Sequence, residues 1–495
     1  MYTQRTQANQ QIQTNSGRRI KFWTNDTFTK QTMNKSTILS LLVALLVYQG
    51  VEAQQDSVFT LNQCIDYAFA NQATVKNAAL DQQISKYKVK ETIAYGLPQI
   101  NFEGNTMYNI QLQPMFMTNQ IANDFVNGGA PLPPGVDPNG TQAIPNLFQL
   151  KGLNTATLNA SQLIFDGSYL VGLKASKTYS ELATKSMTQT KIETTDKITK
   201  GFYLVLINEQ RIQLLDANIA RIDTSLRQLK EINKSGFAEN LDVNRLEVTL
   251  NNLKTDRLNV QNQIIVTYAL LKYQMGYPVN ANLKLSGTLD ELVTRLNTAS
   301  NPDMGSFDYN KRIEYSLLST QKRLEELNFK NTRAISYPKL VAFGTAGLVN
   351  SQNDYMKLYS TSYYGYGFIG AKLSVPIFTG GNHYFQQQGA KLKVQKIQND
   401  MEMMEGGIDL QVQQTKVILD NNLENIKSQR RNLELAEQVI KQTKIKYDEG
   451  VGSNIEVVDA ENSFKTSQTN YYDAVYNALV SLIDYQKATG TLFAE

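Results

Sequence analysis

An internal duplication constrains this chain more than any other feature of its sequence. Three pieces recur in the same order in both halves: Lys90–Gly104 (KETIAYGLPQINFEG) with Lys330–Gly344 (KNTRAISYPKLVAFG), Ser161–Gly167 (SQLIFDG) with Ser374–Gly380 (SVPIFTG), and Ser235–Glu247 (SGFAENLDVNRLE) with Glu449–Glu461 (EGVGSNIEVVDAE). One short match of this kind would be weak, but three matches in one order predict a duplicated fold. After its N-terminal segment, the chain therefore divides into a first repeat over 54–290 and a second repeat over 291–495.

Each repeat is predicted to contain a pair of β-strands. A helical stretch ends before Pro98 in the first repeat and before Pro338 in the second, because proline disfavours a continuing helix. Beyond Pro98, apolar Ile100 and Phe102 alternate with polar neighbours, as in a strand with two different faces. Each predicted strand is long enough to cross a bilayer when tilted, since about 9–11 residues suffice. The predicted strands cover 97–113, 153–166, 337–350 and 366–378.

A loop joins the strands of each pair, near 114–150 in the first repeat and near 350–362 in the second. The first loop contains GGAPLPPGVDPNG, whose proline, glycine and asparagine residues favour turns without a regular period. Aromatic residues flank the second loop and suit a membrane interface, although strands favour such residues in any setting. We expect both loops to face the outside of the cell, because they lie at the strand ends away from the helices.

A long helical hairpin follows the second strand of each repeat, at 168–276 and 380–490. The first helix runs from about 168 to 234 without proline, and at 1.5 Å per residue it would span roughly 100 Å. Its apolar residues recur by sevens, as at Val205, Ile212 and Ile219, which is typical of coiled-coil packing. An amphipathic helix of a soluble bundle is the competing interpretation, but few globular domains need a helix of this length.

The returning helix of each hairpin is only about half as long as its partner. These helices are predicted near 240–275 and 454–489, each ending at a glycine. The helical stretches near 74–95 and 305–335 can continue the two columns. Each long helix is therefore predicted to pack beside two short helices stacked end to end.

Residues 1–53 are interpreted as a signal peptide that is removed from the mature protein. A basic start precedes the apolar stretch Thr37–Tyr48, and a small-residue cleavage site ends at Ala53. The polar residues 1–32 are compatible with a true start at Met33. The mature chain then carries 43 basic and 43 acidic residues, and this neutral balance argues against a nucleic-acid partner.

The mature sequence offers no constellation for catalysis or for metal binding. Its single histidine, His383, and its single cysteine, Cys64, have no second residue of either type to complete a metal site. A phosphate-binding G-x-x-x-x-G-K motif is absent as well. We therefore expect a protein that is not an enzyme, holds no cofactor and takes the energy for any transport from a partner.

Four strands cannot close a transmembrane barrel by themselves. Open sheet edges are not viable in lipid, and bacterial barrels begin at eight strands, so other copies of the chain must complete the sheet. Two copies would supply eight strands and three would supply twelve. The residues alone do not decide between a dimer and a trimer. A barrel of eight strands is filled by its own side chains, so a conducting duct requires the larger number.

The ordered duplication resembles the TolC-like outer membrane factors. The resemblance covers about residues 57–490 and includes the LPQI, QLIFDG and G-x-x-x-N-[LI]-[DE]-V pieces. It implies an α+β membrane protein in which a homotrimer shares a 12-strand β-barrel in outer-membrane lipid and an α-helical tunnel in the periplasm. It also implies docking to a periplasmic adaptor (membrane fusion) protein and an inner-membrane transporter, in a tripartite efflux or type I secretion system.

Two other classes of protein compete with this interpretation. A periplasmic coiled-coil adaptor would show one hairpin flanked by soluble domains, whereas this chain has two hairpins that each follow a strand pair. A structural coiled-coil protein of the cell surface would not need the four strands. Migration as a heat-modifiable trimer from the outer-membrane fraction would separate the three classes.

The hairpin turns supply the candidate functional residues. Gly236, Gly450 and Gly452 lie at the tips farthest from the strands, where we expect the adaptor to dock. Just beyond each turn an acid falls at the matching place of the repeat, Asp242 or Glu456, and Asp459 follows on nearly the same face as Glu456.

The three acids have two interpretations. Acids in the first turn of a helix also stabilise the free N–H groups there. For Asp242 and Glu456, this structural role is the alternative to a role in the pore. By resemblance, Asp242, Glu456 and Asp459 are the residues of the periplasmic constriction, and Glu456 and Asp459 point inward. The sequence departs from the family in having Glu456 where an aspartate is usual, and Gly452-Ser453 where a basic gating partner is placed.

Overall fold

A computed structural model describes residues 58–146, 148–298 and 307–493. The predicted signal peptide 1–53, its cleavage site after Ala53 and the alternative start at Met33 lie outside the described residues. Within 57–495 the described elements form one compact unit.

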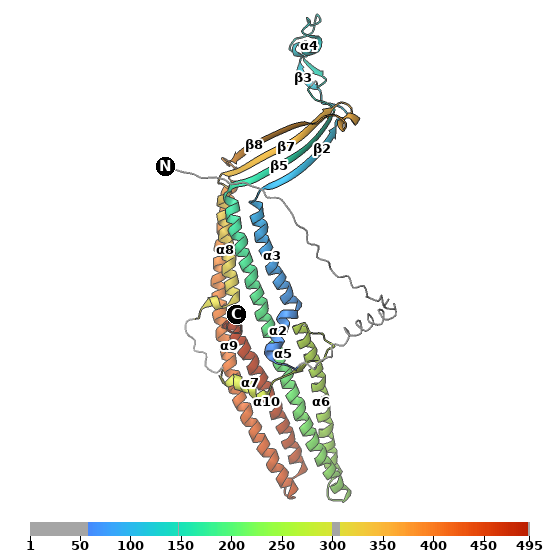
Figure 1. The fold of residues 1–495 in the computed structure, drawn as a ribbon. Coiled ribbons are helices and arrows are strands. Elements are labelled where there is room, and N and C mark those ends of the chain that lie inside the picture. Colours follow the sequence, from blue (N-terminus) through green and yellow to red (C-terminus); the bar gives the residue numbers. More distant parts are fainter. Residues whose placement is uncertain (1–57, 147, 299–306, 494–495) are drawn as a thin grey trace, which may run out of the picture. The chain divides into compact units, whose positions relative to one another are not determined.

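The four long strands form one open antiparallel sheet in the order β2-β5-β7-β8 (Figure 1). Among the described residues, strands β2 and β8 therefore each keep one unpaired edge. The strand bounds are Gln99–Tyr108 for β2, Gly152–Asp166 for β5, Lys339–Gln352 for β7 and Tyr364–Ser374 for β8.

Two of the predicted strands are longer than the strands in the structure. Strand β2 begins at Gln99, not at 97, because the Leu97 N–H still donates to the Ala94 carbonyl and Pro98 has no N–H to donate. It ends at Tyr108, before the chain turns away at Pro114, and not at 113. Strand β8 ends at Ser374, not at 378, because Pro376 cannot donate to the ladder.

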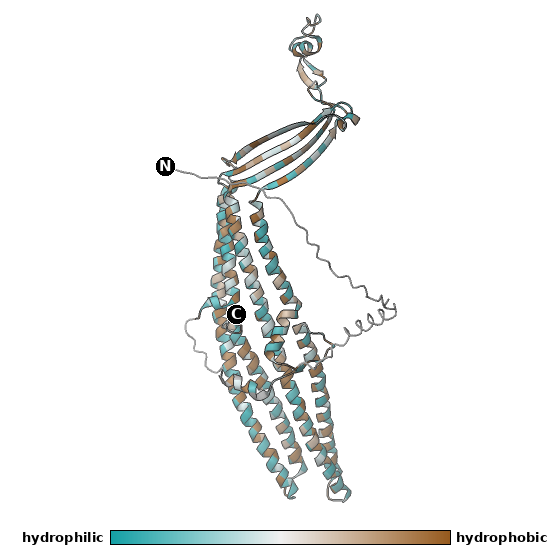
Figure 2. Cartoon of the chain, in the orientation of Figure 1, coloured by the Kyte–Doolittle hydropathy of each residue, from teal (hydrophilic) through white to brown (hydrophobic). Residues whose placement is uncertain are grey.

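In its middle, the register of the sheet places apolar residues of neighbouring strands together on one face. Phe102 lies opposite Leu158, which lies opposite Ala346, so these side chains share one face. One residue further along, Glu103 lies opposite Thr157 on the other face. Figure 2 shows the corresponding change between brown and teal along the strands. On the β7–β8 side the second face also carries Phe343 and Phe368, whose rings are in contact, so the separation is incomplete there.

The first loop is not the unstructured turn region that its composition predicts. It contains β3 (Met115–Thr118), α4 (Asn119–Asn127) and β4 (Thr141–Ile144), with β3 and β4 paired antiparallel. Thr118 caps α4 by accepting from the Ile121 N–H. Strands of four residues are too short to show a period in the sequence, which is why the prediction missed them.

Two very long helices dominate the chain. Helix α5 (Gly167–Lys234) has 68 residues and α9 (Asn382–Asp448) has 67, and they turn back into α6 (Asn240–Met275) and α10 (Asn454–Ala488). Asp166 caps α5, since its carboxylate accepts from the N–H groups of Ser168 and Tyr169. The two short helices that lead into the sheet are α3 (Ala73–Tyr95) and α8 (Ile313–Ala334).

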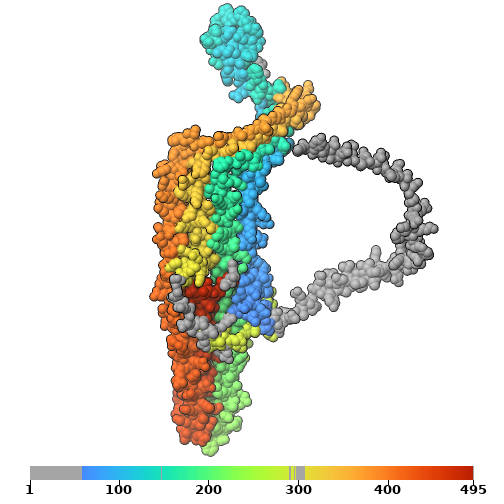
Figure 3. Space-filling model, turned by 60° about the vertical axis from the view of Figure 1, so that its left-hand side comes forward, coloured from blue at the N-terminus to red at the C-terminus, as the bar shows by residue number. Residues whose placement is uncertain are grey.

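The helices stand side by side in the order of the strands to which they connect. Helix α3 packs on α5, α5 on α8, and α8 on α9, which Figure 3 shows as blue, green, yellow and orange columns. In the lower half, α6 packs on α5 and α10 on α9, with α10 also against α5. The single chain is therefore a wall of four columns below a wall of four strands, with α9 at one edge.

Over the part of the chain that the structure describes, the hydrophobic core is divided into three clusters. The largest lies where α2 (Leu61–Asn71) and α7 (Leu289–Thr298) meet the long helices, and contains Cys64, Leu271 and Leu479. Burial raises the pKa of the Cys64 thiol to about 12, so this cysteine is a packing residue with little thiolate. Below it, the α5–α6 hairpin and the α9–α10 hairpin each have a core of their own.

None of the helices in the described ranges combines the length and the apolar character needed to cross a membrane.

Acidification is expected to weaken the contact between α5 and α10 through Asp196. Burial alone would raise the pKa of Asp196, but hydrogen bonds and charge from Lys200 and Lys487 outweigh it and hold the pKa below its usual range. A lowered pKa contributes stability that is present above the unfolded value of about 3.9 and is lost as the pH falls through the folded value. The melting temperature measured from pH 7 to pH 3 should therefore fall more steeply for the wild type than for Asp196→Asn. Parallel curves would contradict this assignment.

Candidate functional site

The three tip glycines are required for two different reasons. Gly236 and Gly450 have φ angles of 84° and 74°, in the left-handed region that ends a helix and favours glycine. Gly452 has no such angle, but a Cβ there would lie 3.0 Å from the Tyr447 backbone nitrogen, so a larger residue would push the turn off the end of α9. Both turns are thus held close to their long helices.

Each tip presents an apolar side chain to solvent that the sequence interpretation overlooked. Phe237 is 87% exposed and Val451 is 79% exposed, and each directly follows a glycine with positive φ. The two residues occupy the same place in the two repeats, and this glycine–apolar pair is the sequence signal that would have found them. Large exposed apolar side chains at matched positions are typical of a docking surface.

The two tips share a groove. It has a volume of about 470 Å³ and receives Gly236 and Asp242 from the first hairpin and Gly452 from the second. The Asn454 side chain joins the hairpins across it by donating to the Asp242 backbone oxygen at 3.2 Å. At the edge of the groove, burial and the nearby carboxylates of Asp242 and Asp448 raise the pKa of Tyr447.

The structure separates the three predicted acids. Asp242 lines the groove and its carboxylate lies 3.5 Å from Arg245, one turn along α6. Glu456 and Asp459 are exposed on α10 outside the groove lining, and within the described residues neither makes an ion pair. Ser453 caps α10 through the Glu456 N–H, so the backbone of Glu456, and not its carboxylate, performs the capping.

A buried polar bridge joins the two hairpins above the tips. The Arg221 guanidinium donates to both carboxylate oxygens of Glu461, at 2.7 and 2.8 Å, and also to Asn218. Asn218 in turn donates to Gln468. Glu461 is only 7% exposed, whereas its counterpart in the first repeat, Glu247, is half exposed and pairs with Lys230 at the surface. Periodicity alone gave no sign of this difference.

Two further ion pairs extend this bridge toward the waist, which is the level where α2 and α7 meet the long helices. Lys465 of α10 contacts Asp256 of α6, and Arg211 of α5 contacts Asp473 of α10 at 3.3 Å. The interface between the hairpins at this level therefore combines these polar contacts with Val458 of α10, which packs against the apolar core of the α5–α6 hairpin.

Helix α9 carries a second apolar stripe on the side opposite its core contacts. Its buried residues, such as Ile408 and Leu419, face α8 and α10. The second stripe is exposed and repeats at helical spacing, at Leu392, Met403, Leu410, Val417, Leu435 and Val439. The opposite edge of the wall is also apolar, with Leu80, Ile84 and Tyr87 on α3 and Val248, Leu258 and Ile265 on α6. Both edges of the single chain therefore present apolar side chains to solvent.

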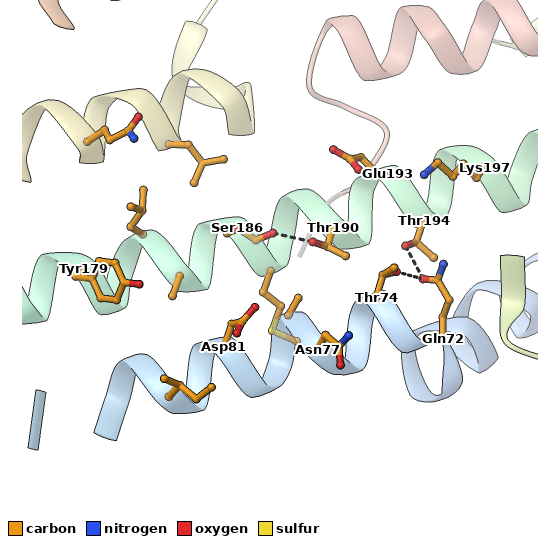
Figure 4. Close-up of a pocket in the computed structure, with 17 residues that line it drawn as sticks. Gln72, Thr74, Asn77, Asp81, Tyr179, Ser186, Thr190, Glu193, Thr194 and Lys197 are labelled. Carbon is orange, nitrogen blue, oxygen red and sulfur yellow. Dashed lines mark hydrogen bonds between the residues drawn. The ribbon is translucent and has the colours of Figure 1, made fainter. Parts of the chain in front are cut away.

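A larger cavity of about 860 Å³ lies beside the waist, between α3 and α5, but none of the predicted site residues lines it. Figure 4 shows Gln72, Thr74 and Thr194 joined by hydrogen bonds at one end, with both Thr hydroxyls donating to the Gln72 side-chain oxygen. Acidic Asp81 and Glu193 share the lining with basic Lys197, which leaves the lining with one formal negative charge in excess. Among the described residues, no group of three or more His, Cys, Asp and Glu side chains is placed to hold a metal ion.

Comparison with known proteins places these features in context. Residues 317–491 match the family described as outer membrane efflux protein. Outer membrane protein TolC of Vibrio cholerae serotype O1 is 21% identical over 342 residues, which make up 69% of this chain and 77% of that protein. Two further curated relatives are matched over 40% and 58% of their own length.

Solved structures resemble the chain over most of its length. CusC superposes with a TM-score of 0.68 at 16% identity, over 87% of this chain and 91% of that chain. VceC from Vibrio cholerae superposes with a TM-score of 0.65 at 13% identity, over 87% of this chain and 96% of that chain. At these identities the likeness concerns the fold.

Proposed function

We propose that this chain, which is a TolC-like outer membrane efflux protein, closes as a homotrimer into a duct through which substrates pass from the periplasm to the cell exterior. Its relatives are outer-membrane channels of efflux systems, so the expected resemblance is confirmed, and the chain is the outer-membrane exit duct of such a system. The family consists of channel proteins and not of enzymes. Conduction is passive, with energy supplied by the pump.

The open sheet is the main observation in support of the proposed trimer. Strands β2 and β8 have unpaired edges, and a backbone edge cannot face lipid without a hydrogen-bonding partner. Pairing β8 of one copy with β2 of the next is a head-to-tail contact that closes into a ring, and three copies give the proposed 12-strand barrel. The face with Phe102 and Leu158 then contacts lipid, and the face with Glu103 lines the lumen.

The helical edges support the same ring. The exposed stripe of α9 would pack against α3 and α6 of the neighbouring copy, which buries the apolar side chains at both edges of the wall. Each repeat, 54–290 and 291–495, would supply one half of every copy's wall. The outer loops would face the outside of the cell, and the signal peptide 1–53 would be removed after Ala53.

The ring and the duct are tested together on the full chain. We expect the protein in the outer-membrane fraction, migrating as a trimer that dissociates on heating, and forming a conducting pore in planar bilayers. Monomers alone after cross-linking in detergent extracts would argue against the trimer. A soluble periplasmic protein would point to the adaptor class, and a surface protein without conductance would point to the structural coiled coil.

The tips are proposed to dock a periplasmic adaptor, which joins the duct to an inner-membrane transporter. Phe237→Ala together with Val451→Ala should weaken adaptor binding by up to about 1,000-fold, since each buried apolar anchor contributes about 2 kcal/mol. These residues test docking better than Gly236→Trp with Gly452→Trp, because the turns themselves require those glycines. Pull-down of the adaptor by the purified trimer measures the effect. The matched control is Phe125→Ala, an exposed aromatic of the first loop, which should bind normally. Equal binding by the double variant would move the docking site elsewhere.

The exposed acids of α10 are proposed to form a constriction at the tunnel end, with Asp242 nearby. Threefold symmetry would place six carboxylates from Glu456 and Asp459 around one axis, which attracts cations. Glu456→Gln with Asp459→Asn should lower the cation-over-anion permeability ratio by about threefold or more in planar bilayers. Asp448→Asn removes another exposed tip acid and should leave the ratio as it is. Wild-type selectivity in the double variant would mean that Glu456 and Asp459 serve only to solvate the start of α10.

A further inference from the structure

We propose that β8 of one copy pairs with β2 of the next copy in a defined register, with Ser374 opposite Glu103, and that Lys372 and Glu103 form an ion pair across this seam. The seam is the contact between β8 and the neighbouring β2, and it occurs three times in the ring. This inference rests on the trimer proposed above and adds which residues meet where two copies join.

The two repeats share one strand register. The matched sequence pieces relate each residue of β2 to the residue 240 positions later in β7, and each residue of β5 to the residue 213 positions later in β8. In the first repeat Gln99 lies opposite Ser161. Their counterparts in the second repeat, Lys339 and Ser374, also lie opposite each other. The duplication therefore holds residue by residue in the sheet.

The same correspondence turns the β5–β7 contact into a prediction for the seam. Strands β5 and β7 join the first repeat to the second within one copy, and β8 with the neighbouring β2 would join the second repeat to the first. Ser161 lies opposite Phe343 in the β5–β7 ladder. The counterparts of these two residues are Ser374 and Glu103. A closed ring built in this way repeats one kind of joint between all its repeats.

The predicted register keeps each face of the sheet continuous across the seam. Glu103 and Tyr366 share one face through the paired strands between them, and Ser374 lies an even number of residues from Tyr366 along β8. Glu103 and Ser374 therefore both face the proposed lumen. A shift by one residue would turn one strand's lumen side toward lipid, so only shifts by two or more residues compete with this register.

The charges on the lumen face of the four described strands divide into two kinds. Asp166 and Lys339 lie directly opposite each other and form an ion pair at 3.2 Å within one copy. Glu103 and Lys372 are exposed, and within the described residues neither has an ionic partner. These two opposite charges lie on β2 and β8, the edge strands that the seam would join.

The predicted register brings the two free charges together. With Ser374 opposite Glu103 of the next copy, Lys372 lies two residues further along β8 on the same face. Such diagonal neighbours across a ladder are within reach of long side chains. The matching positions of the β5–β7 joint hold Asn159 and Phe343, so this pair of charges is specific to the seam.

The ion pair also selects the kind of contact that the edges make. Two β8 edges would bring one Lys372 near another, and two β2 edges would do the same with Glu103. Like charges across a ladder are destabilising, whereas β8 with β2 places opposite charges together. The charges therefore favour the head-to-tail contact that closes a ring over a twofold dimer.

Disulfide cross-linking of the full-length trimer tests the register. Ser374→Cys with Glu103→Cys, and Ala371→Cys with Thr106→Cys, should each give a covalent trimer on a denaturing gel, because opposite residues have Cα atoms about 4.5–5.5 Å apart. The exchanged combinations, Ser374→Cys with Thr106→Cys and Ala371→Cys with Glu103→Cys, point to opposite faces about 10 Å apart and should not cross-link. Native Cys64 is fully buried and will not compete.

An internal pair shows that the cross-linking chemistry works. Ser161→Cys with Phe343→Cys joins positions that are opposite within one copy, so it should form a disulfide without linking copies. Absence of both predicted cross-links in an intact trimer would overturn the register. A cross-link of Lys372→Cys with Glu103→Cys in place of Ser374→Cys with Glu103→Cys would overturn it as well. A wild-type chain that forms no trimer would instead count against the duct.

Charge reversal tests the ion pair separately from the register. Glu103→Lys alone and Lys372→Glu alone should each lower the temperature at which the trimer dissociates by about 5 °C, because each places like charges at every seam. The two reversals together should restore the wild-type temperature. Lys357→Glu, an exposed lysine of the second loop, is the control and should leave the temperature as it is. A double variant no more stable than the single ones would show that the two charges do not meet.

Discussion

Leu410→Asp is expected to give a folded chain that no longer assembles into a trimer. Leu410 is 66% exposed in the single chain, so an aspartate there should change the stability of one copy by less than about 0.5 kcal/mol. In the ring, the same side chain would lie against the apolar edge formed by α3 and α6 of the next copy. An unpaired carboxylate buried in such an interface costs several kcal/mol, and the ring contains three such interfaces.

The result is measured by migration on a gel and by mass in detergent, with conductance lost in parallel. Lys393→Asp is the control. It changes the net charge by more than Leu410→Asp does, and it lies on an exposed face of α9 outside the second stripe. It should still form trimers. A normal trimer from Leu410→Asp would mean that α9 does not face a neighbouring copy, and closure of the sheet would need another arrangement.

Arg221→Met should destabilise the lower hairpins by about 3 kcal/mol. The substitution keeps much of the packing against Phe464, over whose ring the guanidinium lies, but it leaves the Glu461 carboxylate buried without its cation. Breaking a buried ion pair on one side is costly because the remaining charge loses both water and partner. The loss should appear as amide hydrogen exchange that is about 100-fold faster in segments 215–230 and 457–468.

Lys427→Met is the matched control for this prediction. Lys427 pairs with Glu424 on the surface of α9, and both side chains are largely exposed. Such pairs contribute at most about 0.5 kcal/mol, so exchange should remain within about twofold of the wild type. Equal exchange in Arg221→Met and the wild type would show that the bridge does not hold the hairpins together.

The sequence anticipated features that depend on short stretches of backbone. Proline at 98 and 338 marked the entry to the first strand of each pair, and positive φ at Gly236 and Gly450 accounts for the hairpin turns. The helix after the first turn is α6 at Asn240–Met275, as its period and its terminal glycine predict. The strand end at Tyr108 was missed because alternation persists at Ile110 and Leu112 after the ladder has stopped, and the end at Ser374 because apolar residues continue past Pro376.

Only part of the candidate site could be predicted from short stretches of the sequence. The sequence could place Asp242 and Glu456 at matching positions, but not that Asp242 lines a groove shared by both tips while Glu456 lies outside it. The exposed Phe237 and Val451 carried a readable signal in the repeat. The pairing of Arg221 with Glu461 did not, since the two residues are 240 positions apart and belong to different repeats.

What the sequence determined by itself is the set of parts: two strand pairs, two long hairpins and the glycine turns between their helices. These follow from periods of two and seven and from the backbone limits of proline and glycine, which act over a few residues. The tertiary structure decided the strand order β2-β5-β7-β8, the separate core of each hairpin, and the burial of Glu461 but not of Glu247. Repeats of similar sequence acquire different roles because burial depends on which neighbour packs against each copy, and packing joins residues that no local period relates.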